Sequence, residues 1–253
     1  MNKKSKNSFN IEGDIIYITR PECNFIAKAT VRDDYVEEIE SVTWELSNNR
    51  YPYNSKYGTL HNYIMKKWYG ENVLKKMKDA GFVVDHMDNV SYNCCIENLC
   101  FLSNNANKAK GLTLDKEIKD KKYIALSMYK DFNTQLLQIT IVFNNPAILE
   151  GIENLSKPAV AELAYFLYEG DNYDLVINDA QQILLNYKKY QTFNPNKLNF
   201  IDYHIEGAFG QPLTFEEYDN YLLKVRNSAS IVKKAPIRNW NKNTKREFLY
   251  LRD

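Results

Sequence analysis

The chain has few cysteines, and none of them has the spacing of a metal-binding or disulfide framework. Only four of the 253 residues are cysteine. Cys94 and Cys95 are adjacent, Cys100 lies alone in an apolar stretch, and Cys23 is distant. Without a Cys-x-x-Cys pair, a tetrahedral structural zinc site is not expected. We therefore predict reduced thiols, most of them buried.

The sequence also lacks any long apolar run. No stretch approaches the roughly 20 apolar residues that span a bilayer, and no apolar core segment follows the first residues, Met-Asn-Lys-Lys-Ser-Lys-Asn-Ser. With 44% hydrophobic and 26% charged residues, the chain can bury a sizeable core in one large or several small domains. We expect a cytoplasmic protein with no membrane partner.

One short polar region carries the most informative pattern. A valine-rich strand, residues 82–84, leads into Asp85 and His86, and a polar loop and a second apolar strand, residues 99–102, follow. The Ser-Asn-Asn cluster after that strand can cap a short helix that carries Asn107. Two strands and a helix can therefore bring Asp85, His86 and Asn107 to one point.

These residue types suit phosphodiester hydrolysis. A hard divalent cation neutralises the charge that develops on the transition state and on the departing oxygen. Asp85 offers a carboxylate and Asn107 an amide carbonyl, which leaves positions for water and phosphate oxygens. His86 can take a proton from the attacking water because an unperturbed imidazole has a pKa of about 6.5. Asn98 can bond backbone groups across the loop and hold the imidazole in register. We expect one divalent cation, Mg²⁺ with Mn²⁺ as the alternative, and no small-molecule cofactor.

The same residues resemble the HNH endonuclease family, especially its homing-type and phage-borne members. The motif of that family looks like D-H-x-D-x(4)-N-x(4)-N-L followed by S/T-x(3)-N. It is matched here by Asp85, His86, Asp88, Asn93, Asn98, Leu99, Ser103 and Asn107. The resemblance implies a ββα-metal core of the H-N-N type acting on double-stranded DNA. In such a core Asp85 and Asn107 bind the metal, His86 is the general base, and Asn98 braces the loop.

The resemblance covers about the first 113 residues, less than half of the chain. Related proteins carry a Leu-His helix before the motif, seen here at Leu60-His61, and before it an acidic helix leading to a strand with a tryptophan, seen here at Trp44. The chain departs from the family at Cys95 and Cys100, where related sequences have arginine. A cysteine cannot replace the fork-shaped phosphate donor of arginine. The metal and base positions are intact.

The net charge of +1 hides an uneven distribution along the chain. Residues 51–113 carry eight lysines and five acids, residues 146–223 four lysines and twelve acids, and residues 224–253 nine basic and two acidic residues. Basic stretches can neutralise phosphates, whereas the acidic middle is expected to face away from DNA or to contact the basic tail. For the lysines of the helix expected at 59–69, a solvated face is an equal alternative. The residues expected to contact DNA are Lys66, Lys67, Asn93, Lys108, Lys110, Lys233, Lys234 and Arg238.

The pattern predicts an α+β fold, and the resemblance implies a ββα-metal nuclease core between an N-terminal strand-rich region and a C-terminal α+β accessory region. We divide the chain into a strand-rich region at 1–55, the nuclease core at 56–113, a charged linker at 114–122, an accessory domain at 123–195, and a helical segment with a basic tail at 196–253.

Hydrophobic spacing and breaker residues predict the individual elements. Upstream of the motif we expect strands at 15–18, 25–31 and 43–47 and helices at 34–41, 59–69 and 71–78. Downstream we expect a hairpin of 123–129 with 136–143 and helices at 157–168, 176–187 and 215–225. Pro158 supports the helix at 157–168, because proline is favoured in a first helical turn.

Three functions remain open at this point. The first is a site-specific, metal-dependent DNA endonuclease of the homing or phage type. The second is a DNA-binding protein on a catalytically weakened HNH scaffold, which Cys95 and Cys100 suggest. The third is a defence or toxin nuclease of low specificity, whose accessory surface reads phosphates rather than bases. The intact Asp85, His86 and Asn107 favour the endonuclease, whereas the target sequence and the oligomeric state stay open.

Overall fold

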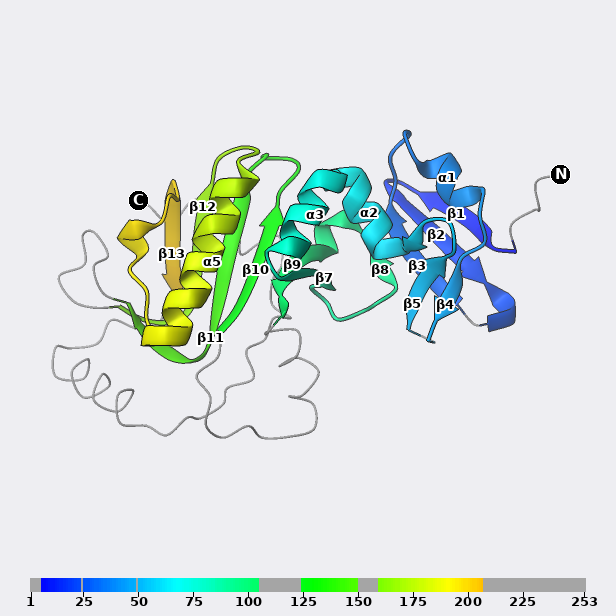
Figure 1. The fold of residues 1–253 in the computed structure, drawn as a ribbon. Helices are drawn as coiled ribbons and strands as arrows, with labels where there is room; N and C mark the ends of the chain where they lie inside the picture. Colours follow the sequence, from blue (N-terminus) through cyan, green and yellow to red (C-terminus); the bar gives the residue numbers. More distant parts are fainter. Residues whose placement is uncertain (1–5, 24, 49, 105–123, 150–158, 207–253) are drawn as a thin grey trace. The chain divides into compact units, whose positions relative to one another are not determined.

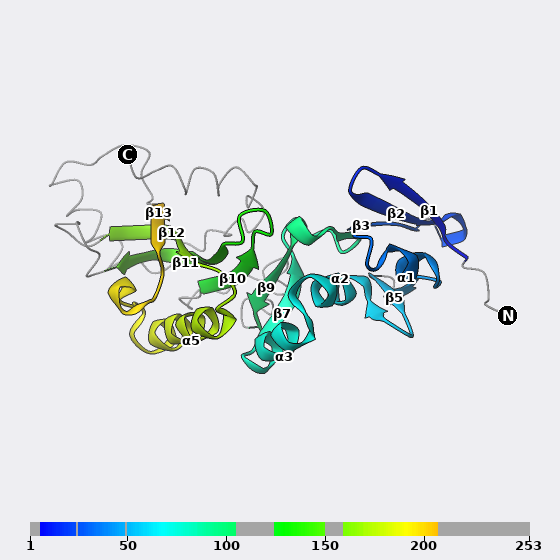
Figure 2. The same cartoon turned by 90° about the horizontal axis from the view of Figure 1, so that it is seen from above.

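The computed structural model describes residues 6–23, 25–48, 50–104, 124–149 and 159–206. This part of the chain has an α+β fold with four α-helices and with sheets of four, six and three strands (Figures 1 and 2). The predicted α+β class is confirmed. The linker expected at 114–122, the helix expected at 215–225 and the basic tail lie outside the described residues. None of the described helices is long and apolar enough to cross a membrane.

The chain divides into two compact units. The first comprises Met1–Asp79 and Val84–Phe101, and the second comprises Ala80–Val83 and Leu102–Asp253. The finer division of the chain into five segments stays a prediction.

A four-stranded sheet occupies the N-terminal part of the first unit. Its order is β1-β2-β3-β8, formed by Ser8–Glu12, Ile15–Arg20, Phe25–Thr30 and Asn93–Cys94. The first three strands are antiparallel, and alternate residues such as Ile16, Ile18 and Ala27 are buried on one face. The predicted strands at 15–18 and 25–31 are confirmed. The parallel pairing of β3 with β8, a strand of the motif loop, was not predicted.

Short helices and a small sheet complete the first unit. The helices are α1 (Val36–Glu40), α2 (Leu60–Tyr69) and α3 (Glu71–Asp79), and the sheet consists of β4 (Glu45–Ser47), β5 (Tyr51–Asn54) and β6 (Gly58–Thr59). Gly70 ends α2 with a φ of 84°, where glycine is favoured, and its N–H donates to the carbonyl of Lys66. The helices predicted near 34–41, 59–69 and 71–78 and the strand near 43–47 are confirmed.

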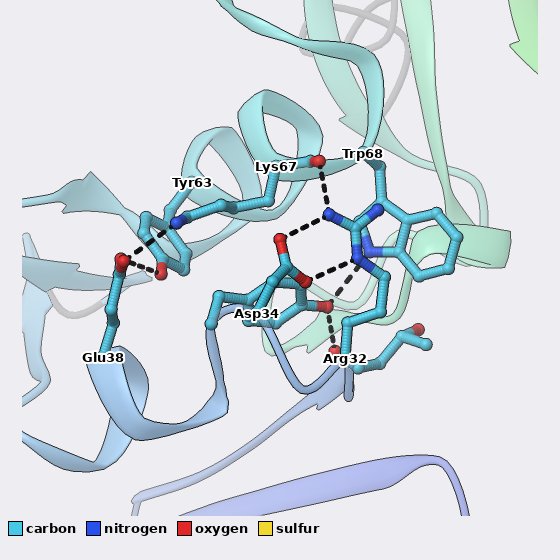
Figure 3. Close-up of polar contacts among 8 residues, drawn as sticks. Arg32, Asp34, Glu38, Tyr63, Lys67 and Trp68 are labelled. Carbon is cyan, nitrogen blue, oxygen red and sulfur yellow. Dashed lines mark hydrogen bonds and ion pairs between the residues drawn. The ribbon is translucent and has the colours of Figure 1, made fainter.

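Polar side chains connect α1 and the segment before it with α2 (Figure 3). The guanidinium of Arg32 donates to both carboxylate oxygens of Asp34 at 2.8 Å and to the carbonyl of Lys67 at 2.9 Å. The carboxylate of Glu38 accepts from the hydroxyl of Tyr63 at 2.6 Å and from Nζ of Lys67 at 3.0 Å, and these two donors lower the pKa of Glu38. The network fixes α2, and hence any residue that α2 carries, against the N-terminal part of the unit.

Tyr35 links three segments through one buried hydroxyl. It donates to the carbonyl of Thr30 at 2.5 Å, at the end of β3, and it accepts from Nε1 of Trp68 at 3.0 Å, in α2. Burial raises the pKa of Tyr35 to about 12, so the hydroxyl keeps its proton at neutral pH. The guanidinium of Arg32 lies 4.8 Å from the centre of the Trp68 ring and adds a cation–π contact.

A six-stranded sheet contains the two motif strands. Its order is β13-β12-β11-β10-β9-β7. The strands are β7 (Phe82–His86), β9 (Leu99–Ser103), β10 (Ile124–Lys130), β11 (Leu137–Leu149), β12 (Ala159–Tyr168) and β13 (Asp202–Glu206). Strands β10 to β13 pair antiparallel, and α5 (Tyr173–Tyr190) follows β12. The predicted hairpin and the helix predicted at 176–187 are confirmed.

The helix predicted at 157–168 is wrong, because residues 159–168 form strand β12. This strand lies between β11 and β13, with Ala164 paired to Ile141 and to Ile205. Consecutive side chains from Ala164 to Tyr168 are buried, so both faces of the strand are covered. Such a strand has a continuous apolar run, which periodicity does not distinguish from a buried helix. Pro158, which supports the first turn of a helix in the sequence prediction, therefore precedes a strand.

We predict that Tyr35→Phe lowers the free energy of unfolding by about 1–3 kcal/mol, because it removes the acceptor of Trp68 Nε1 and leaves the buried Thr30 carbonyl without its donor. Urea unfolding monitored by circular dichroism measures the change. Tyr53→Phe is the matched control, since Tyr53 is 39% exposed. Equal stability of the two variants would contradict the role of the Tyr35 hydroxyl.

Candidate functional site

Asp85 and His86 are the last two residues of β7, and the loop that follows is closed onto β9. The backbone N–H of Met87 donates to the carbonyl of Asn98 at 2.8 Å, directly before β9 begins. The predicted strand, loop and strand are confirmed. Asp85 is partly buried at the strand end beside His86. The helix expected to carry Asn107 lies beyond Asn104, outside the described residues.

The carboxylate of Asp88 is the centre of the loop. Its Oδ1 accepts from the backbone N–H of Val90 at 2.8 Å and from Nδ2 of Asn98 at 2.9 Å, and its Oδ2 accepts from Nδ2 of Asn93 at 2.7 Å. Three donors to one carboxylate form strong, charge-assisted hydrogen bonds. Both oxygens of Asp88 are thus used inside the loop.

Asn98 spans the loop from the other side. Its Oδ1 accepts from the backbone N–H of Asp88 at 3.1 Å, and its Nδ2 also donates to the carbonyl of Asn93 at 2.8 Å. These contacts confirm that Asn98 bonds backbone groups across the loop. Its part in catalysis stays a prediction, as does DNA binding by Asn93, whose side chain here bonds Asp88 and, at 3.4 Å, the N–H of Cys95.

The loop is also anchored to the N-terminal sheet. The N–H of Lys28 donates to the carbonyl of Tyr92 at 2.9 Å, next to the parallel pairing of β3 and β8. The hydroxyl of Thr30 accepts from the N–H of Ile96 at 2.9 Å and donates to Oε2 of Glu97 at 3.3 Å. Strand β3 therefore fixes residues 92–97 of the loop.

The imidazole of His86 is enclosed by side chains from three other segments. It is only 5% exposed. The ring of Tyr51, in β5, is stacked on it at 6.2 Å with an interplanar angle of 23°, and the ring of His61, in α2, meets it edge to face at 5.1 Å. The Sγ of Cys94, in β8, lies 3.9 Å from its Nε2. The orientation of the ring is therefore set by side chains distant in sequence.

The cysteines around the site, Cys94, Cys95 and Cys100, are buried thiols outside any disulfide, as predicted. Burial raises the pKa of Cys94 well above its usual value and that of Cys95 to about 11. Both are therefore neutral thiols near pH 7. Cys94 can serve the imidazole as a weak hydrogen-bond partner without adding a charge.

The sequence interpretation did not assign His61, which contacts His86, to the site. Burial, and secondarily the neighbouring His86, lower its pKa to about 3, so it is neutral at physiological pH. Its Nε2 lies 3.1 Å from the hydroxyl of Thr59, whereas its Nδ1 is buried without a hydrogen-bond partner among the described residues. The Leu60-His61 pair was noticed as part of the resemblance, and that signal could have placed His61 in the site. Nothing local in the sequence indicated Tyr51.

The lysines expected to bind DNA are only partly described. Lys66 pairs with Glu71 at 3.1 Å and Lys67 with Glu38 at 3.0 Å, so both have partners within the protein. This arrangement agrees with the alternative of a charged helix face. Lys108, Lys110, Lys233, Lys234 and Arg238 lie outside the described residues.

The expected metal would be bound by Asp85 and Asn107. Within the described ranges no group of three or more His, Cys, Asp and Glu residues is arranged to hold a metal ion. An ion held by one carboxylate and one amide would not require such a group, and Asn107 is not described. The hard oxygen donor of Asp85 suits Mg²⁺ or Mn²⁺, whereas Asp88 is already occupied by three donors.

No family model matches the chain, and no curated protein or solved structure matches it either. The function of the site therefore has to be inferred from its own geometry and chemistry.

We predict that His61 makes the protein less stable in mild acid. In the unfolded chain this histidine titrates at about pH 6.5, but in the folded protein its pKa is about 3. Between these values the unfolded state binds the extra proton, so stability falls as the pH falls. From about pH 7 to about pH 5 the wild type should lose about 2 kcal/mol more than His61→Gln.

Urea unfolding at the two pH values measures this difference. The glutamine is uncharged throughout and offers an amide to Thr59 in place of the imidazole. If the stability of both proteins changes equally with pH, His61 is not buried in its neutral form.

Proposed function

We propose that the chain is a divalent-metal-dependent DNA endonuclease of the HNH type, with His86 as general base and a single cation on Asp85 and Asn107. The observation that carries the proposal is the adjacent Asp85 and His86 at the end of β7, in a strand-loop-strand frame that Asp88 and Asn98 hold closed. Phosphodiester hydrolysis needs an oxygen ligand and a proton acceptor beside each other, which this pair supplies.

The surroundings of His86 support its role as a base because they hold the ring in place. The Sγ of Cys94 lies 3.9 Å from Nε2, and the tautomer of the imidazole decides which of the two atoms donates. The unprotonated nitrogen of the neutral ring carries the lone pair that takes the proton from the attacking water. Tyr51 and the neutral His61 hold the plane of the ring, so that little reorientation is needed when the proton moves.

Asp85 and Asn107 would hold the cation through a carboxylate and an amide oxygen. When bound, the cation supplies positive charge that stabilises the transition state and the departing oxygen. Asp88 instead orders the loop through its three hydrogen bonds. Site-specific cleavage, with residues 123–253 selecting the target, and a cytoplasmic location belong to the same proposal.

A second candidate, a DNA-binding protein on a weakened scaffold, is favoured by the burial of His86. At 5% exposure the imidazole has little contact with solvent, and Cys95 and Cys100, where the motif suggests arginine, are buried. Such a protein would bind duplex DNA and leave it intact.

We predict that the purified chain cleaves duplex DNA with Mg²⁺ or Mn²⁺ and that EDTA stops the reaction. His86→Ala should lower the cleavage rate about 10²- to 10⁴-fold, the usual contribution of a general base. Asp85→Asn should cause a comparable loss, because it removes the negative charge of a metal ligand. Gel analysis of plasmid and linear DNA with mapping of the cut ends measures both rate and specificity.

Tyr53→Phe serves as the control here as well, since Tyr53 is 39% exposed and has no part in the proposed site. Circular dichroism verifies that each variant is folded, and His86→Gln provides a larger replacement should alanine perturb the packing. Equal rates for the wild type and both His86 variants would contradict the assignment of the base. Tight DNA binding without cleavage in either metal would support the second candidate.

A further inference from the structure

We propose that Arg50 binds a phosphodiester of the DNA strand that is cut. This assignment rests on the proposed nuclease function and deepens it by naming a substrate-binding residue. The sequence interpretation gave Arg50 no role, and Arg238 was the arginine among its expected DNA contacts.

Arg50 lies one aromatic ring away from the proposed base. Its guanidinium carbon is 5.1 Å from the centre of the Tyr51 ring, and that ring is the one stacked on His86 at 6.2 Å. A cation over an aromatic face is held in place by the quadrupole of the ring. The Tyr51 ring thus positions the guanidinium and the imidazole together.

The main chain of Arg50 is fixed to the motif loop as well. Its carbonyl accepts from the hydroxyl of Ser91 at 2.6 Å, and Ser91 lies between Asp88 and β8. Arg50 is therefore connected to the site through its side chain and through its backbone. A residue anchored in this way keeps its place relative to the loop.

The positive charge of Arg50 is available to a ligand. Of the three arginines in the described residues, Arg20 pairs with Glu22 and Glu45 and Arg32 pairs with Asp34. Arg50 is exposed, and within the described ranges no carboxylate pairs with it. An exposed guanidinium held by a ring and lacking an internal anion is suited to bind an external one.

A phosphodiester is the anion that fits this position. The planar guanidinium donates two parallel hydrogen bonds to phosphate oxygens, a geometry that a thiol cannot reproduce. Cys95 and Cys100, which stand where the motif suggests arginine, are buried, and burial keeps Cys95 uncharged. Arg50 would supply the missing guanidinium from a segment outside the motif.

The test compares Arg50→Gln and Arg50→Lys with Lys56→Gln. Lys56 is a matched control in the same unit, because it is exposed and its Nζ lies 4.6 Å from the centre of the Tyr57 ring, which contacts Trp44 and Tyr63. Binding to a short DNA duplex is measured in EDTA at several salt concentrations, and cleavage is measured separately with Mg²⁺. Thermal unfolding verifies that all three variants are folded.

Arg50→Gln should weaken binding about tenfold or more at low salt and reduce the slope of log affinity against log salt by about 0.9, the value for one phosphate contact. It should also lower kcat/KM for cleavage. Arg50→Lys should recover the slope and part of the affinity, because it restores the charge without the planar fork. Lys56→Gln should leave binding and cleavage unchanged.

The assignment is overturned if Arg50→Gln binds like Lys56→Gln, or if Arg50→Lys recovers nothing. Because binding is measured without metal, this result is independent of cleavage. A wild-type protein that never cuts DNA would refute the endonuclease alone, whereas normal cleavage by Arg50→Gln would refute only the role of Arg50.

Discussion

The carboxylate of Asp88 determines the shape of the loop on which the proposed site depends. It gathers the side chains of Asn93 and Asn98 and the backbone of Val90 around one negative charge. The loop, which would otherwise be a flexible polar connection, is thereby held closed between β7 and β9. Asp85 and His86 gain a defined position because the loop that follows them has one shape.

The candidate site is assembled from segments far apart in the sequence. The N-terminal sheet holds residues 92–97 of the loop, β5 and α2 contribute the rings against His86, and the network of Arg32, Tyr35 and Glu38 fixes α2. The region upstream of the motif is therefore part of the site. The motif supplies the proposed base and metal ligand, but the orientation of the His86 ring depends on β5 and α2, upstream of the motif.

Much of the fold, and less of the site, could be predicted from the sequence. Strands β7 and β9 and helices α2 and α3 followed from apolar spacing and from breakers such as Gly81, because these signals are local. Strand β12 was predicted as a helix because a fully buried strand has no alternation. The contacts of Tyr51, His61 and Cys94 with His86 arise from tertiary packing, and the pairing of β3 with β8 spans only two residues. No local pattern indicates such contacts.

Strand β8 is synthesised long after β3, the strand with which it pairs. Strand β3 acquires its parallel neighbour only when residues near Cys94 have been made. The hydroxyl of Thr30 acquires the N–H of Ile96 only 66 residues of synthesis after Thr30 itself. At typical ribosomal speeds this takes on the order of several seconds. Throughout that interval the β3 edge of the nascent sheet has backbone N–H and C=O groups that no strand pairs. Such an edge can be bound by chaperones and by neighbouring chains.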